Sequence, residues 1–217
     1  MSDLTPQELR VLGCLVEKGA TTPDYYPLTL NALITACNQR SNRDPVVDYD
    51  DATVIRAIDG LRDRGWIRLV RSPGQRAVKY RHVLDDVLEV DDAEAAILAV
   101  LSLRGEQTPG ELRARTDRYV EFDDLDEVEA TLERLADRGL VHRLERRPGE
   151  KESRYVQMLA GSEAPPADER LPEESTPEAA DDETASRIET LEARVEAIAA
   201  DLAALRADLG AAPGPAD

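Results

Sequence analysis

The chain has 217 residues, with 27 Lys or Arg against 45 Asp or Glu, which gives a formal net charge of −18. Its longest uninterrupted apolar run, Ala95–Leu101, is far shorter than the roughly 20 residues that a membrane-spanning helix needs. Two cysteines far apart, Cys14 and Cys37, argue against a disulfide framework, and two histidines argue against a His-rich site. We therefore expect a soluble, cytoplasmic protein that uses no metal or cofactor and is not an enzyme.

The negative charge is concentrated in the C-terminal two thirds of the chain. Residues 1–83 carry 12 basic and 10 acidic side chains, residues 84–160 carry 11 and 20, and residues 161–217 carry 4 and 15. A near-neutral first third with local basic clusters can approach an anionic partner, whereas the acidic remainder repels one.

Parts of the first two segments resemble each other. Leu15–Gly19 corresponds to Leu101–Gly105, and in both places Thr-Pro follows after two residues. Leu61–Ile67 likewise corresponds to Leu135–Val141. Internal repetition of this length predicts two small domains of the same type, the first over residues 1–83 and the second over the following segment.

The first domain is predicted to contain three helices and a two-stranded hairpin. A helix begins at Thr5, where Glu8 completes a capping box, and a later helix stops at Gly65. Apolar spacing and turn signals give the remaining bounds. The predicted elements are helices from Thr5, over residues 29–38 and over residues 50–64, and strands over residues 66–71 and 77–83.

The second domain, residues 84–160, repeats this order. Asp91 and Glu94 form another capping box, and further helices begin at Thr108 and Asp124. The predicted strands cover residues 141–145 and 152–157. Three helices closed by a β-hairpin are the winged-helix variant of the helix-turn-helix. The sequence therefore predicts a helix-rich α+β fold with two winged-helix domains in tandem.

The C-terminal segment has a different character. Residues 161–186 hold nine acidic residues and four prolines, which predicts a disordered linker. An amphipathic helix over residues 187–210 and a tail over residues 211–217 follow. The apolar residues of this helix recur at alternating intervals of three and four, which favours self-association as a homodimer, with docking on its own chain as the alternative. They are Ile188, Leu191, Val195, Ile198, Leu202, Leu205 and Leu209.

Short motifs throughout residues 4–160 resemble a known family. They are Gly13–Lys18, Tyr26–Asn31, Thr35–Val46, Thr108–Arg113 and Glu127–Glu133. This pattern is similar to that of the bacterial YceH family. The resemblance implies a tandem winged-helix protein, and it implies no particular biochemical role, because a fold does not fix a function.

The first hairpin is the strongest basic feature of the sequence. No acidic residue lies between Arg64 and Asp85. A basic hairpin can lie along duplex DNA and neutralise phosphates, although its arginines can also pair with nearby carboxylates. The polar segment 38–45 supplies further candidates, with a helix-ending turn as its alternative role. The residues predicted to contact nucleic acid are Arg40, Arg43, Arg56, Arg68, Arg71, Arg76 and Lys79.

The third helix of each domain argues against reading of base sequence. Asp50 and Asp51 begin this helix in the first domain, where they repel phosphate. In the second domain the outward residues are all acidic, which favours a basic protein partner. They are Asp126, Glu127, Glu129, Glu133 and Asp137.

Two functions remain open from the sequence. One is a regulator that contacts the backbone of duplex DNA through the first domain, with little sequence preference. The other is a protein-interaction scaffold without DNA contact, similar in architecture to the ScpB subunit of bacterial condensin-like complexes. The distribution of charge separates the two. The basic hairpin next to the basic loop 38–43 favours the regulator, whereas the net charge of −18 and the acidic third helices favour the scaffold.

Overall fold

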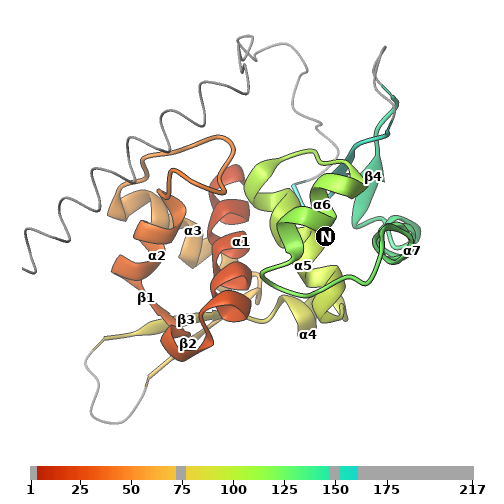
Figure 1. Cartoon of the computed structure of the whole chain (residues 1–217). Coiled ribbons are helices and arrows are strands. Elements are labelled where there is room, and N and C mark those ends of the chain that lie inside the picture. The colour runs from red at the N-terminus through yellow and green to blue at the C-terminus, as the bar shows by residue number, and fades with distance from the viewer. Residues whose placement is uncertain (1–3, 72–76, 147–151, 161–217) are drawn as a thin grey trace, which may run out of the picture. The chain divides into compact units, whose positions relative to one another are not determined.

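Helices predominate in the computed structural model of the chain, which describes residues 4–71, 77–146 and 152–160 (Figure 1). The first half, residues 4–83, consists of α1 Pro6–Thr21, the 3-10 turn η1 Pro23–Tyr25, β1 Leu28–Thr29, α2 Leu30–Cys37, α3 Asp51–Asp63, β2 Ile67–Val70 and β3 Lys79–His82. The second half, residues 84–160, consists of α4 Leu84–Leu88, α5 Asp92–Arg104, α6 Pro109–Thr116, α7 Leu125–Asp137, β4 Val141–Arg143 and β5 Tyr155–Gln157. The predicted helix-rich α+β class is confirmed.

Local side-chain chemistry determines where the longer helices begin. Six of them start at a Thr or Asp whose side chain accepts a hydrogen bond from the backbone N–H three residues later, which satisfies a donor that the helix itself leaves free. These caps are Thr5, Thr29, Asp50, Asp91, Thr108 and Asp124. The predicted capping boxes at Thr5 and Asp91 are both confirmed.

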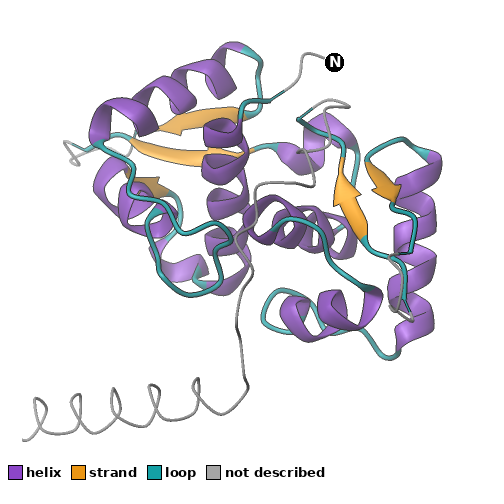
Figure 2. Cartoon of the chain, turned by 90° about the horizontal axis from the view of Figure 1, so that it is seen from above, coloured by secondary structure: helices purple, strands orange, loops and turns teal. Residues whose placement is uncertain are grey.

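The strands form two separate sheets, one in each half (Figure 2). In the first half the order is β1-β3-β2, and both pairings are antiparallel, with Leu28 opposite Tyr80 and Ile67 opposite His82. In the second half β4 pairs antiparallel with β5, and a single bridge joins Gln107 to Tyr155. The sequence predicts β2 to β5 but neither β1 nor α4.

Helices α1 and α5 lie side by side and join the two halves (Figure 1). They pack against each other more extensively than any other pair of elements in the described ranges. Gly13 allows this approach, because a Cβ atom there would lie 2.9 Å from Cγ of Leu103. Residues 95–101 of α5 are all buried, as expected of a helix inside a core. The described elements belong to one compact unit, Met1–Ala164, so the two halves share one core.

None of the helices in the described ranges is both long enough and apolar enough to cross a membrane. The predicted linker, residues 161–186, lies outside the described residues, as do the heptad helix over residues 187–210 and the tail over residues 211–217. The boundary between domains at residues 83 and 84 stays a prediction.

Candidate nucleic-acid interface

The β2–β3 hairpin carries basic side chains on the face that points away from the core. Ile67 is buried, and successive residues of a strand point to opposite faces, so Arg68 lies on the outer face. Arg68 stands directly opposite Arg81, and Lys79 stands opposite Val70 two residues away on the same face. Like charges in directly opposite positions destabilise a sheet. An anion that lies across the hairpin would remove this repulsion.

The cations of this hairpin have no carboxylate partner among the described residues. Arg68 and Arg71 are exposed, Lys79 and Arg81 are half-buried, and none of the four forms an ion pair within the described ranges. Arg81 Nε instead donates to the carbonyl oxygen of His82 at 3.4 Å. Arg81 is not among the predicted contact residues, although its spacing of two from Lys79 in a predicted strand places both on one face.

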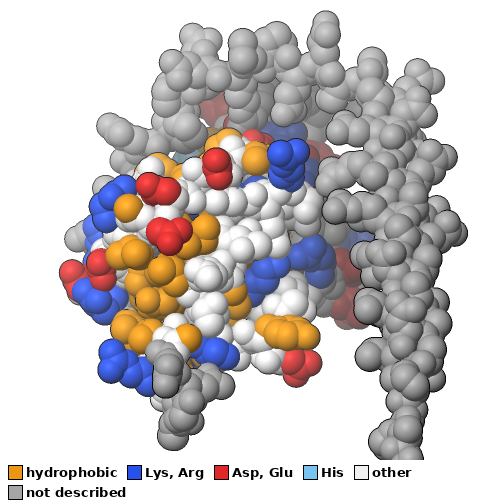
Figure 3. All heavy atoms as spheres, turned by 90° about the vertical axis from the view of Figure 1, so that its left-hand side faces the viewer, with side chains coloured by type: hydrophobic (Ala, Val, Ile, Leu, Met, Phe, Trp, Pro, Cys, Tyr) orange, Lys and Arg blue, Asp and Glu red, His pale blue; other side chains and the backbone are white. Residues whose placement is uncertain are grey.

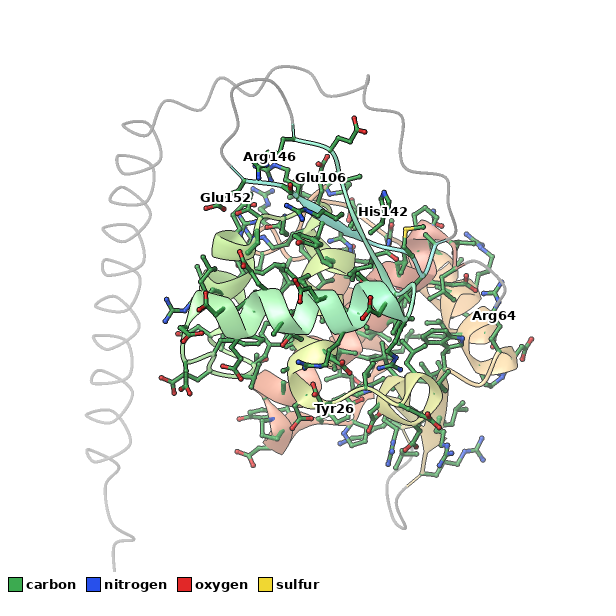
Figure 4. The ribbon with its side chains drawn as sticks, turned by 90° about the vertical axis from the view of Figure 1, so that its right-hand side faces the viewer. Tyr26, Arg64, Glu106, His142, Arg146 and Glu152 are labelled. Atoms are coloured by element: carbon green, nitrogen blue, oxygen red, sulfur yellow. The ribbon has the colours of Figure 1, made fainter. Side chains whose placement is uncertain are left out.

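The hairpin of the second half has a mixed charge. Figure 4 shows Arg146 and Glu152 at the outer end of this hairpin. Glu145 lies next to Arg146 in sequence, and Arg154 forms an ion pair of 3.0 Å with Glu111. The first hairpin differs from the second in holding no acidic residue at all, so its positive charge is not offset within the hairpin.

Helix α3 adds little positive charge to the first half. Arg56 is exposed, and its Nη2 donates to Oγ1 of Thr53 at 3.1 Å, beside an open hollow of about 360 Å³ between α3 and the start of α1. Arg62 is neutralised by Asp59 at 2.8 Å, and Asp51 is exposed at the start of the helix. The start of α3 is therefore acidic and its arginines are already bonded, which opposes insertion of this helix into a groove of DNA.

An apolar surface also lies on the first half. Figure 3 shows hydrophobic side chains gathered on one face of it, with Lys and Arg side chains along the lower edge. Ile55 of α3 and Leu69 of β2 are among the exposed apolar residues, with 42% and 39% of their surface accessible. The outer part of the first half therefore combines apolar and basic surface.

The loop after α2 holds two of the predicted contact residues, and the structure separates them. Arg40 is exposed, whereas the side chain of Arg43 is 0% exposed. Arg43 donates to both carboxylate oxygens of Glu17, at 2.5 and 3.2 Å, and its Nε donates to the carbonyl of Ala36 at 3.0 Å. The prediction that Arg43 contacts nucleic acid is wrong, because its guanidinium neutralises a buried carboxylate of α1. Arg76 lies outside the described residues.

Glu17 also binds residues of the second half. Its Oε1 accepts hydrogen bonds from Arg118 at 3.1 Å and from the hydroxyl of Tyr119 at 3.4 Å, and its side chain is 1% exposed. Burial raises the pKa of Glu17, but the hydrogen bonds and the charge of Arg43 outweigh burial and hold this pKa below its usual value. Glu17, Arg43, Arg118 and Tyr119 form what we term the Glu17 cluster, which ties the two halves together.

The two cysteines and His82 have structural surroundings. Cys14 and Cys37 are buried, and the ring of His82 packs against that of Tyr26 with centroids 5.9 Å apart. The backbone N–H of His82 donates to the hydroxyl of Tyr26 at 2.7 Å. Among the described residues, no three His, Cys, Asp or Glu side chains lie close enough together to hold a metal ion.

Fold and surface together define a helix-rich α+β protein whose first half carries a hairpin with basic and no acidic side chains. Residues 4–150 match the family model described as "Protein of unknown function, DUF480". A UPF0502 protein of Opitutus terrae is 49% identical over 191 residues, which are 85% of this chain and 83% of the relative. The UPF0502 protein YceH of Salmonella newport is 44% identical over 198 residues, 88% and 90% of the two chains. The chain belongs to the family that the DUF480 model and these UPF0502 proteins define, which confirms the resemblance to the YceH family.

Proposed function

We propose that the chain is a tandem winged-helix protein whose first half binds the backbone of duplex DNA through the outer face of the β2–β3 hairpin. The order α1, β1, α2, α3, β2, β3 supports this assignment, because it is the order of the winged-helix variant of the helix-turn-helix. From α5 onwards the second half has the same order, with the bridge between Gln107 and Tyr155 in the place of β1.

One observation carries the DNA proposal. Four cations, Arg68, Arg71, Lys79 and Arg81, lie on one hairpin with no carboxylate partner in the described part of the chain. Each phosphate that a cation neutralises releases counterions, so the logarithm of the affinity falls against the logarithm of salt with a slope of about −0.9 per contact. Contacts by Arg68, Lys79 and Arg81, which share the outer face, correspond to a slope of about −2.7. The acidic start of α3 opposes base contacts, so we expect little sequence preference.

The test measures the binding of the full chain to random-sequence duplex DNA by fluorescence anisotropy across a salt series. The double variant Arg68→Gln/Arg81→Gln should bind more weakly, with a slope shallower by about 2. The matched control is Arg143→Gln/Arg146→Gln, which removes the same charge from the second hairpin and should leave the slope unchanged. Absence of binding at low salt, or an equal loss in the control, contradicts the proposal.

A second candidate function rests on α7. Four of its carboxylates, Asp126, Glu129, Glu133 and Asp137, are exposed and form no ion pair within the described ranges. We propose on this ground a basic protein partner for the second half, as in a scaffold of ScpB-like architecture. This candidate predicts salt-dependent binding of poly-lysine that Glu129→Gln/Glu133→Gln weakens. Binding of poly-lysine without binding of DNA would favour the scaffold over the regulator.

We further propose that the chain forms a homodimer through its heptad residues, which lie outside the described residues, and that it acts by binding without catalysis or a cofactor. The heptad spacing of residues 187–210 supports the dimer. Sedimentation equilibrium tests it, with Ile198→Asp/Leu202→Asp expected to convert dimer to monomer. A wild-type chain that sediments as a monomer contradicts the proposal.

A further inference from the structure

The fold brings the two cysteines of the chain together in the core of the first half. Cys14 lies in the middle of α1, and Cys37 is the last residue of α2, which packs against α1. Both residues are 0% exposed, and their thiols are hydrogen-bonded to each other. Two residues that are far apart in the sequence therefore form one pair of thiols in contact, which we term the thiol pair.

A buried cation lies beside the thiol pair with no anion to balance its charge. Arg10 precedes Cys14 by one helical turn on the same face of α1, and it is 4% exposed. Its Nη2 donates to the carbonyl oxygen of Pro45 at 2.5 Å, and its Nη1 has no hydrogen-bond partner among the described residues. Arg10 also forms no ion pair within the described ranges. A buried guanidinium with only a neutral acceptor is costly, so a negative charge nearby would stabilise it.

The carboxylate nearest to the thiol pair is already occupied. Both oxygens of Glu17 accept hydrogen bonds from the buried Arg43, so these two charges cancel within the core. Arg118 reaches the same carboxylate with a side chain that is 47% exposed, so water solvates its charge. The group left to balance Arg10 is the thiol of Cys14, which becomes an anion when it loses its proton.

The hydrogen bond within the pair makes the two thiols unequal. Burial raises the pKa of Cys14, but the hydrogen bond from Cys37 and the charges of Arg43 and Arg10 outweigh burial and hold this pKa below the ordinary thiol value. The same hydrogen bond and burial both raise the pKa of Cys37, which keeps its proton. Burial also raises the pKa of Tyr49, so its hydroxyl stays neutral beside Arg10. A thiolate next to a thiol that donates to it is the arrangement of reactive cysteine pairs.

We propose that Cys14 and Cys37 are a redox-active pair that a peroxide converts to a disulfide. The thiolate of Cys14 attacks one oxygen of the peroxide, so an S–O bond forms, the O–O bond breaks and hydroxide leaves. The sulfur of Cys37 then attacks the sulfenic acid of Cys14. The S–S bond forms, the S–O bond breaks, and the departing hydroxide takes the proton of Cys37 and leaves as water. The two sulfur atoms together lose two electrons, which the peroxide gains.

Burial limits the oxidant to a small molecule. Neither cysteine is exposed, so a bulky disulfide such as oxidised glutathione has no approach, whereas hydrogen peroxide is close to water in size. Cys37 ends α2, and residues 38–50 after it contain no helix or strand in the described structure. Local opening of such a segment admits a small molecule without unfolding of the core. The pair contains no residue of the β2–β3 hairpin, so its oxidation does not depend on DNA binding there.

The test follows oxidation of the full, reduced chain by hydrogen peroxide. Peptide mapping by mass spectrometry should find a disulfide between Cys14 and Cys37 in the oxidised monomer. Because the attacking group is already a thiolate, the rate in the folded chain should change less than about twofold between about pH 6 and pH 8. The chain unfolded in guanidinium has thiols of ordinary pKa, so its rate should rise about tenfold per pH unit over the same range.

Variants separate the roles of the charge and of the second thiol. Arg10→Gln should lower the rate at about pH 6 by about tenfold or more, because loss of the adjacent cation returns the thiol of Cys14 toward its ordinary pKa. Arg10→Lys keeps the charge and should retain most of the rate. The matched control is Arg40→Gln, an exposed cation shortly after α2, which should change the rate less than about twofold. Cys37→Ser should stop at the sulfenic acid of Cys14, which dimedone labels.

The pH profile of the wild-type chain decides if Arg10→Gln fails to fold, because it requires no variant. Three results would overturn the proposal. They are a rate in the folded chain that rises about tenfold per pH unit, an equal loss of rate in Arg10→Gln and Arg40→Gln, and two intact thiols after prolonged exposure of the folded chain to peroxide.

Discussion

Substitution of Glu17 by Gln leaves the guanidinium of Arg43 buried without a counter-charge. The side chains of Glu17 and Arg43 are 1% and 0% exposed, so water cannot replace the lost partner. Removal of one member of a buried ion pair costs about 3–5 kcal/mol. Arg43 keeps neutral acceptors in the carbonyl groups of Ala36 and Asn42. We therefore expect the lower end of this range, a loss of about 3 kcal/mol in the free energy of unfolding.

Urea unfolding of the full chain, followed by circular dichroism, measures this loss. In thermal unfolding it corresponds to a fall in Tm of about 6–12 °C for a unit of this size. The control is Arg118→Gln, since Arg118 binds the same carboxylate from an exposed position and should contribute less than about 1 kcal/mol. The double variant Glu17→Leu/Arg43→Met removes both charges and should recover most of the stability, because no unpaired charge stays buried.

The pH dependence provides an independent check of the same cluster. Because the pKa of Glu17 is lowered in the folded state, its contribution is complete above the ordinary glutamate pKa and is lost as the pH falls through the lowered value. Glu17→Gln should lack this part of the acid-induced loss. A loss below about 1 kcal/mol in Glu17→Gln, or a double variant as unstable as the two single losses combined, would refute the reasoning.

Two other predictions concern packing and protonation. Gly13→Ala should destabilise the fold by about 1–3 kcal/mol, because its Cβ would lie 2.9 Å from Leu103 Cγ. Gly110→Ala is the control: its Cβ would meet no atom nearer than 3.8 Å, so it should stabilise α6 by up to about 1 kcal/mol. Equal effects of the two substitutions in chemical denaturation contradict this prediction. Burial lowers the pKa of His82 in the folded chain, although the carboxylate of Asp85 lies 3.5 Å away. At a pH just below the ordinary histidine pKa, the unfolded chain therefore binds more protons than the folded chain does. The free energy of unfolding then rises with pH between the lowered pKa and the ordinary one. His82→Gln should flatten this part of the Tm profile, and an unchanged slope refutes it.

The sequence predicts the helix starts well because their chemistry is local. A cap such as Thr5 and its partner Glu8 lie three residues apart, so the signal is complete within one turn. Strand β1, Leu28–Thr29, carries no comparable signal, because its pairing partner Tyr80 lies about fifty residues further along the chain. The same reasoning applies to α4, which has no side-chain cap at Val83.

In the candidate site, too, the sequence predicts features that depend on near neighbours in the chain and misses those that depend on distant ones. The outer face of the first hairpin follows from the period of two that places Arg68 on the solvent side, and the structure brings Arg81 opposite to it. The burial of Arg43 could not be predicted, because a loop sequence rich in Asn and Arg also describes an exposed turn. Its partner Glu17 lies 26 residues away, and Arg118 lies 101 residues from Glu17, so only the fold reveals the cluster.

The packing of α1 against α5 has a consequence for how amino-acid substitutions can accumulate in the two halves. Their capping boxes begin at Thr5 and Asp91, so two helices in equivalent places face each other within one chain, as identical helices do between the subunits of a symmetric dimer. In a true homodimer a substitution appears in both copies at once. Here the covalent link keeps each half beside the other at high effective concentration. One half can therefore be cationic on its hairpin while the other is anionic on α7, whereas a substitution in a homodimer changes both subunits alike.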